Sequence, residues 1–252
     1  MPAGTFSKVF QKIKTMTILY STLASLYEEM YRHIFDYEKE YCFYDSILQS
    51  FHCKKILEVA CGTGMLAVRF LDNGYDYLGV DISHQMLDIA RAKIKTDVFV
   101  QCDMRKLPFY DRFDAVLLTG RSVSYITENQ GIIDTLAGIH HSLKNNGIFV
   151  FGIFEANAIF DTMNDSEQIF ELNNKKIKRI NTLRMNLKTG WTYDWHAKYF
   201  IEHDGMVSEF ADDSTLRAFT RDEILLFLKL AGFKVKDIIE EDKVMTLITE
   251  KK

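Results

Sequence analysis

Hydrophobic positions between residues 56 and 155 follow two patterns that alternate along the chain. Short apolar runs predict strands, and these lie at 56–60, 75–82, 97–103, 113–120 and 147–155. Apolar residues at helical spacing predict the intervening helices, at 64–73, 84–94 and 130–144. Strands that alternate with helices form right-handed crossover units, so we predict an α/β fold with a doubly wound, mostly parallel sheet.

The pattern changes on both sides of this region. Residues 18–50 carry Tyr, Leu and acidic residues at helical spacing, which indicates two helices. From about 166 to 218 the segments alternate like antiparallel strands with one solvated face. Helical spacing returns at 220–231, where Thr220 and Glu223 predict a capping box, and two strand-like segments follow.

These changes divide the chain into three parts. We predict an N-terminal helical cap at 1–50, a ligand-binding core at 51–155 and 219–252, and an inserted antiparallel β-layer at 156–218.

Composition and charge narrow the classes of partner. The chain has 252 residues, 47% of them hydrophobic, and a net charge of -4 with acids and bases mixed. Binding to nucleic acid or a membrane surface needs clustered Lys and Arg, so neither partner is expected. No apolar run has the ~20 residues that span a bilayer, and residues 1–17 lack the apolar core of a secretory signal.

The cysteines and histidines indicate the redox compartment and whether a metal site is expected. The cysteines are scattered, which predicts reduced thiols in a cytoplasmic protein, and no His, Cys and Asp set has metal-ligand spacing; the cysteines are Cys42, Cys53, Cys61 and Cys102. We expect a monomer or homodimer that acts on a small molecule.

The segment ILEVACGTGML at 56–66 ends the first predicted strand in a loop that contains Gly62 and Gly64. Ligands of doubly wound sheets bind beyond the carboxyl ends of the strands. Glycine lets a ligand approach the backbone closely, and the start of the next helix presents free N–H groups. The sequence therefore predicts that a ligand binds against this loop.

Two classes of ligand fit the loop. One is a dinucleotide, because GTGMLA matches G-x-G-x-x-A and Asp81 follows about 17 residues later. The other is S-adenosylmethionine, which has a ribose and an amino-acid end but no pyrophosphate. Glu58 would repel a pyrophosphate at short range, whereas it would suit a ligand ammonium held directly or through water.

Three motifs in order resemble those of the class I S-adenosylmethionine-dependent methyltransferases. ILEVACGTG carries Glu58, GVDIS carries Asp81 and VQCDM carries Asp103, each at the end of one of the first three predicted strands. The resemblance covers about residues 50–155, and the paired strand signals after 232 agree with the C-terminal hairpin of that family. It implies a Rossmann-like seven-stranded sheet, with S-adenosylmethionine as cofactor and S-adenosylhomocysteine as product.

The resemblance also implies which residues meet the cofactor. Those expected at its methionine end and beside its sulfonium are Glu58, Ala60, Cys61, Gly62, Gly64, Leu118 and Thr119. Asp81 would accept hydrogen bonds from both ribose hydroxyls, because one ionised carboxylate suits two neutral donors. Those expected around the adenine are Ile82 and Met86 on its faces, Asp103 at its amino group, and Cys102 and Met104 beside it.

A narrower resemblance links the chain to the amino-sugar N-methyltransferases, which act on small molecules. It is carried by YSTLASLYEEMY at 20–31, RSVSYI at 121–126 and LRAFTRDEILLFLKLAGF at 216–233. In that subgroup the inserted layer covers the acceptor. The resemblance also implies that Tyr20 and Tyr27 close over the cofactor. Tyr125 stands where some relatives carry a histidine that could serve as base.

The two candidate catalytic residues are Tyr20 and Tyr125. A phenol with its usual pKa near 10 is a poor general base at neutral pH, so we expect either tyrosine to orient the nucleophile. We predict methyl transfer from S-adenosylmethionine to a small nucleophile, with an amine as the expected acceptor. The alternatives are an NAD-dependent oxidoreductase and a non-catalytic protein that binds S-adenosylmethionine.

Overall fold

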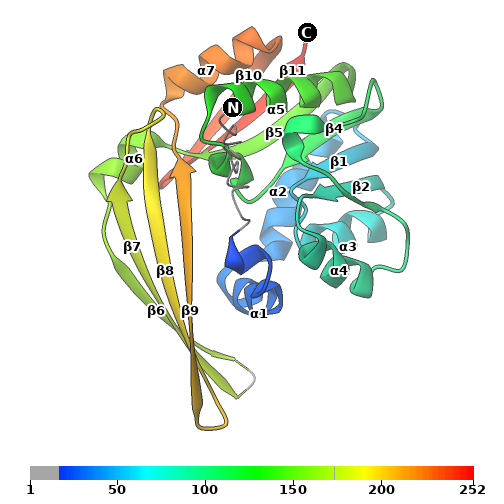
Figure 1. Ribbon diagram of the computed structural model, residues 1–252. Coiled ribbons are helices and arrows are strands. Elements are labelled where there is room, and N and C mark those ends of the chain that lie inside the picture. Colours follow the sequence, from blue (N-terminus) through cyan, green and yellow to red (C-terminus); the bar gives the residue numbers. More distant parts are fainter. Residues whose placement is uncertain (1–16, 173) are drawn as a thin grey trace, which may run out of the picture.

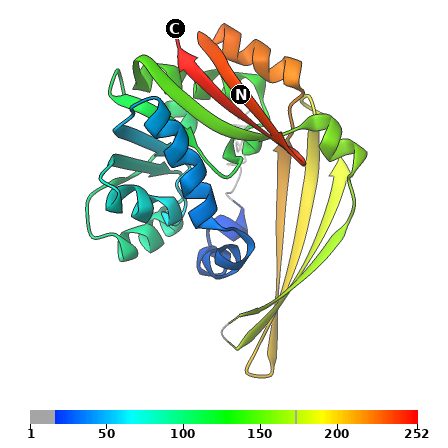
Figure 2. The same cartoon turned by 180° about the vertical axis from the view of Figure 1, so that it is seen from behind.

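Seven strands form the central sheet of the computed structural model, in the order β10-β11-β5-β4-β1-β2-β3 (Figures 1 and 2). They are β1 (Lys55–Val59), β2 (Asp76–Asp81), β3 (Phe99–Gln101), β4 (Phe113–Leu118), β5 (Leu143–Phe154), β10 (Phe233–Glu241) and β11 (Val244–Lys251). Strands β1 to β5 pair in parallel, whereas β11 is antiparallel to β5 and to β10. The predicted mostly parallel seven-stranded sheet and its C-terminal hairpin are confirmed.

The structure describes residues 17–172 and 174–252. The prediction for the first residues of the cap therefore lies outside the described part of the chain. No helix among the described residues is both long enough and apolar enough to cross a bilayer.

Helices cover both faces of the central sheet because successive strand residues point to opposite sides. Leu57 faces the side covered by α5 (Asn129–Ser142) and α7 (Arg221–Leu230). Ile56 faces the side covered by α2 (Tyr37–Ser50), α3 (Met65–Asp72) and α4 (His84–Lys93). Burial on both faces explains why the strand sequences are continuous apolar runs.

The first turns of α4 and α7 show which predicted capping hydrogen bonds form and which one a tertiary contact replaces. Ser83 caps α4, as predicted, by accepting the Met86 N–H at 3.1 Å. Thr220 caps α7 by accepting the Glu223 N–H, but the reciprocal half of the capping box is not formed. Arg217, only 1% exposed, donates to the Glu223 carboxylate at 2.6 Å instead, because a buried guanidinium requires a partner.

A four-stranded antiparallel sheet follows the parallel core and confirms the inserted β-layer. Its strands are β6 (Ser166–Leu172), β7 (Lys175–Met185), β8 (Thr192–His203) and β9 (Met206–Arg217). The short helix α6 (Ala156–Asp161) leads into it from the end of β5. Figure 1 shows this sheet standing beside the core, with its far hairpins pointing away from it.

The N-terminal elements lie between these two sheets, as both cartoon views show (Figures 1 and 2). They are η1 (Ile18–Tyr20), a 3-10 helix, and α1 (Ala24–Ile34). Leu26 and Met30 of α1 pack in one apolar cluster with Ile177 and Tyr199 of the inserted sheet. The cap is thus placed where it can close the space beyond the strand ends.

Candidate functional site

Asp81, the last residue of β2, is 8% exposed and lies at the carboxyl ends of β1 and β2, the edge where doubly wound sheets bind ligands; we call this edge the crevice. Its Oδ2 accepts the Gly62 N–H and its Oδ1 accepts the Ser83 N–H, each at 2.8 Å. Burial raises the pKa of Asp81, and the backbone hydrogen bonds oppose that rise. Each oxygen keeps a second lone pair, so the carboxylate can still accept from two hydroxyl donors.

The loop between β1 and α3 is built from left-handed backbone. Ala60, Gly62 and Gly64 have φ angles of 59°, 54° and 71°. A Cβ on Gly64 would lie 3.1 Å from side-chain carbons of Ala90 and Phe99, so the close packing of α3 requires glycine there. Ala60 has a Cβ in the left-handed region, which costs about 1–2 kcal/mol. The surrounding hydrogen bonds hold this loop in a conformation that its sequence only partly favours.

Glu58 is 2% exposed, and side chains from two neighbouring segments surround it. It accepts the Tyr77 hydroxyl at 2.5 Å and the Thr119 hydroxyl at 2.9 Å. Burial raises its pKa to about 7, although both hydrogen bonds lower it. Glu58 therefore links β1 to β2 and to the end of β4 from beneath the site. Its expected contact with a ligand ammonium stays a prediction.

The remaining cofactor candidates fall into two environments. Ile82 is 51% exposed and offers an open apolar surface beside Asp81, whereas Met86 is 2% exposed inside the core. Asp103 caps the 3-10 helix η2 (Met104–Lys106) and forms an ion pair with Arg105, which lowers the pKa of Asp103. Candidates that are buried or packed against the core are Cys61, Leu118, Thr119, Cys102 and Met104.

The two candidate catalytic tyrosines meet although 105 positions separate them. The hydroxyls of Tyr20 and Tyr125 lie 2.8 Å apart, and their rings pack edge to face with centroids 5.5 Å apart. Tyr125 ends the 3-10 helix η3 (Ser122–Tyr125), which follows β4. Burial raises the pKa of both phenols well above the usual value, so both remain protonated at neutral pH. The pair can orient a nucleophile but is a poor base.

Two hydrogen bonds of Ser83 connect Asp81 to the backbone of Tyr20. The Ser83 N–H binds Asp81, and the Ser83 hydroxyl donates to the carbonyl oxygen of Tyr20 at 2.6 Å. Tyr27 of α1 packs edge to face on Tyr20 with centroids 5.4 Å apart. Burial raises the pKa of Tyr27, and the nearby Asp81 charge adds to that rise. Tyr20 and Tyr27 of the cap therefore lie close to Asp81 and Ser83.

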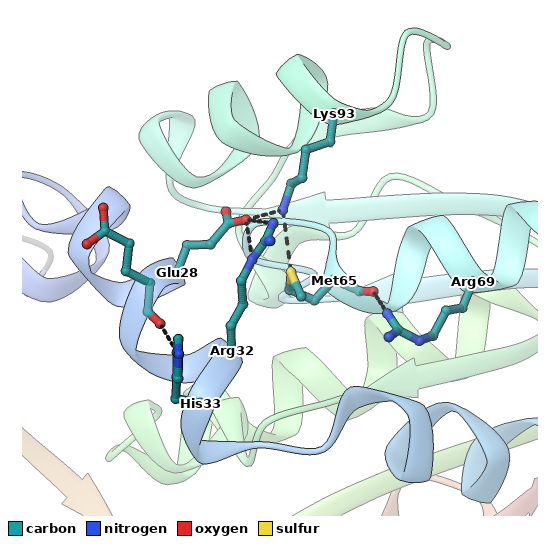
Figure 3. A network of polar contacts seen from close by, with 7 residues as sticks. Glu28, Arg32, His33, Met65, Arg69 and Lys93 are labelled. Carbon is teal, nitrogen blue, oxygen red and sulfur yellow. Dashed lines mark hydrogen bonds and ion pairs between the residues drawn. The ribbon is translucent and has the colours of Figure 1, made fainter. Parts of the chain in front are cut away.

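An ion-pair cluster fastens α1 to the helices that follow the crevice (Figure 3). Glu28 Oε1 accepts from Lys93 Nζ of α4 at 2.9 Å and from Arg32 at 2.5 Å. Lys93 Nζ also lies 3.5 Å from the sulfur of Met65, the first residue of α3. Burial lowers the pKa of Lys93, and Glu28 opposes that shift. We call Glu28 and Lys93 the cap latch.

Several contributors were not identified from the sequence. Tyr77 could have been found, because strand alternation places it on the same face of β2 as Gly79, the register partner of Glu58. The second role of Ser83, the cap latch, and Asp212, which accepts the Ile18 N–H at 2.7 Å, carry no local signal. Each of these depends on segments that only the fold brings together.

Comparison with known proteins relates this chain to methyltransferases. Residues 56–147 match the family described as Methyltransferase domain. YqeM, a methyltransferase-family protein of Bacillus subtilis (strain 168), is 30% identical over 153 residues, which cover 59% of this chain and 61% of that protein. A methyltransferase-family protein of Geobacillus sp. (strain WCH70) is 30% identical over 190 residues, which cover 73% of this chain and 76% of that protein.

A solved structure shares the whole architecture. The sugar N-methyltransferase KedS8 from Streptoalloteichus sp. ATCC 53650 superposes with a TM-score of 0.79, covering 100% of this chain and 98% of its own. At 19% sequence identity, this likeness concerns the fold alone.

Proposed function

This chain belongs to the class I S-adenosylmethionine-dependent methyltransferase family, and from that premise we propose that it methylates a small-molecule amine. The observation that carries the proposal is the Asp81 carboxylate, which the Gly62 and Ser83 amides hold at the carboxyl end of β2. S-adenosylmethionine supplies an activated methyl group on a sulfonium. The assignment to this family takes the place of the dinucleotide alternative.

The residues at the crevice suit this cofactor. Asp81 retains acceptor capacity for two ribose hydroxyls, and half-exposed Ile82 can pack on an adenine face. No atom lies within 4 Å of where a Cβ on Gly62 would be, so a ligand can approach the backbone there. Glu58, Thr119 and the rest of the predicted set would complete the methionine and adenine ends.

The tyrosine pair suits an amine acceptor. When one phenol donates to the other, the pair still has one free O–H and free lone pairs to position an amine. An amine nitrogen held by this pair would bond to the methyl carbon as the carbon–sulfur bond breaks, and the surplus proton of the product would pass to water. Positioning in line supplies much of the rate in such a displacement. KedS8, by name a sugar N-methyltransferase, supports an amine by analogy.

The proposal extends to the setting of the reaction. The inserted sheet would cover the acceptor, with the cap closing over the cofactor. We place the activity in the cytoplasm, carried out by a monomer or homodimer on a small molecule, with neither nucleic acid nor membrane as partner.

Two measurements test the proposal. Calorimetry should show tight binding of S-adenosylhomocysteine and none of NAD. Transfer of labelled methyl groups to a panel of small amines should then give turnover. Tight binding of NAD alone would contradict the cofactor assignment. Binding of S-adenosylhomocysteine without any turnover on amines, alcohols or carbon acids would instead favour the non-catalytic alternative.

A further inference from the structure

Arg121 occupies an unusual place at the acceptor side of the site. It follows Gly120, and both have left-handed backbone, with φ angles of 58° and 63°. The same residue begins the turn into η3, which carries Tyr125. Its guanidinium carbon lies 5.4 Å from the ring centroid of Phe35 and 5.6 Å from that of Phe154. Two aromatic rings from distant segments thus hold the guanidinium, as favourable cation–π contacts do.

This guanidinium has no polar partner among residues 17–172 and 174–252. The half-buried side chain makes no hydrogen bond or ion pair within that part of the chain, and its Nε is buried. The two buried arginines of this part of the chain, Arg179 and Arg217, differ because their guanidinium groups have polar partners, although each keeps one unpaired nitrogen. Arg217 binds Thr127, Asn129 and Glu223, and Arg179 binds Gln168. Because buried polar groups are nearly always paired, Arg121 has the features of a group that awaits a ligand.

The parts that surround Arg121 are those expected to enclose the acceptor. Phe35 directly follows α1 of the cap and Phe154 ends β5 of the core. Burial raises the pKa of Tyr193 in the inserted sheet, and the Arg121 charge is near enough to oppose that rise. Tyr125, four residues further on, contributes to the tyrosine pair. A ligand bound here would therefore contact all three parts of the fold beside the proposed nucleophile position.

The charge balance favours a singly charged, planar ligand group. Burial raises the pKa of Glu40 of α2 and the nearby Arg121 charge opposes that rise, yet the two side chains form no ion pair within 4.0 Å. This nearby acid would oppose a doubly charged phosphate more than a carboxylate. A carboxylate also matches the two parallel N–H donors of a guanidinium fork.

We propose that Arg121 binds the carboxylate of the methyl acceptor, so that the acceptor is a small amine that also carries a carboxylate. This inference rests on the proposed function and specifies its substrate class. It gives the site two anchors, with the tyrosine pair at the nitrogen and Arg121 at the acid.

The test compares matched acceptors in matched variants. A panel of small amino acids, each with its neutral amide, and phosphoethanolamine as a phosphate probe would receive labelled methyl groups from S-adenosylmethionine. The wild type should prefer acids to their amides at least tenfold in kcat/KM. Arg121→Gln should lower kcat/KM for the acids about 10- to 100-fold and change the amides little, as expected for loss of charge-assisted hydrogen bonds. Arg121→Lys should recover part of that loss.

The control is Arg221→Gln, because Arg221 is an exposed residue of α7 paired with Glu240. It should leave every rate unchanged. Calorimetry with S-adenosylhomocysteine separates the cofactor from the acceptor and should give the same affinity in all variants. If Arg121→Gln fails to fold in a thermal scan, the test uses Arg121→Lys instead. The ratio of kcat/KM for acids to kcat/KM for amides should then be lower in Arg121→Lys than in the wild type, and an unchanged ratio would contradict the proposal.

Three outcomes would overturn the assignment while S-adenosylhomocysteine still binds the wild type. They are equal use of acids and amides, preference for phosphoethanolamine, and turnover of no acid in the panel. A tenfold loss of S-adenosylhomocysteine affinity in Arg121→Gln, with an unchanged ratio of acid to amide, would place the guanidinium on the carboxylate of the cofactor instead. Absence of S-adenosylhomocysteine binding in the wild type would refute the proposed function itself.

Discussion

The cofactor crevice and the acceptor side of this protein are built in different ways. The crevice is formed by consecutive strand–loop units, because Gly62 lies in the loop after β1 and Asp81 ends the adjacent β2 only 19 positions later. The acceptor side joins remote segments, since 105 positions separate Tyr20 from Tyr125 and 194 separate Ile18 from Asp212.

This difference indicates a division of labour. Backbone amides and buried strand ends form the crevice, which suits a constant cofactor. The acceptor side depends on the cap and the inserted sheet, whose side chains can change without disturbing the parallel core. Substitutions in the crevice should therefore alter cofactor affinity, whereas substitutions on the acceptor side should alter turnover.

The largest expected effect is on the crevice. Asp81→Asn should weaken S-adenosylhomocysteine binding at least 100-fold, because two hydrogen bonds to a charged acceptor contribute about 3 kcal/mol or more. Calorimetry measures the affinity. Asp76→Asn, at the exposed start of the same strand, should change it little. Unchanged affinity in Asp81→Asn would refute the assignment of the ribose to this residue.

The next effect concerns Glu58 and the stability of the crevice. Its pKa is about 7 in the folded protein against 4.5 as the unperturbed value, so the folded state holds a proton that the unfolded state releases. The Glu58 contribution is therefore fully present below pH 4.5 and is lost as the pH rises through 7, by about 3 kcal/mol at most.

Glu58→Gln should not show this loss of folding stability at high pH, because the glutamine side chain does not titrate. Urea unfolding at pH 5 and pH 8 should show the stability of Glu58→Gln rising relative to the wild type as the pH increases. Glu38→Gln, which alters an exposed acid of α2, should keep the wild-type pH dependence. The same dependence in Glu58→Gln would show that Glu58 is not the titrating group.

The tyrosine pair tests the acceptor side. Tyr20→Phe and Tyr125→Phe should each lower kcat about tenfold while S-adenosylhomocysteine affinity stays within about twofold, because each removes the same hydroxyl contact and keeps the ring. The double variant should lose little more than either single one, as partners in one hydrogen bond do. Tyr110→Phe, at a 75% exposed residue, is the control. Additive losses would contradict a shared role.

The smallest effect concerns the cap latch between the two regions. Glu28→Gln removes the charge that binds Lys93, which should raise the dissociation rate of S-adenosylhomocysteine about fivefold, or about 1 kcal/mol for a half-buried pair. Stopped-flow displacement measures this rate. Glu38→Gln breaks the more exposed pair with Arg69 and should leave the rate unchanged. Equal rates in both variants would show that the latch does not restrain the cofactor.

The amino-acid sequence by itself determined the parallel core and much of the crevice. Apolar periodicity located its strands and helices, and the Gly62 loop and Asp81 follow them at fixed offsets, because the carboxyl ends of neighbouring parallel strands must share one edge. Ser83 was also predictable as a helix cap, since capping depends on its immediate neighbours.

Only the tertiary structure decided the rest. It turned Glu58 inward between Tyr77 and Thr119, set Tyr20 against Tyr125, and placed Arg121 between Phe35 and Phe154. These contacts join segments whose distance along the chain carries no information about their distance in space. Side-chain packing between the cap, the core and the inserted sheet selects them, and no local pattern of hydrophobic and polar residues records that choice.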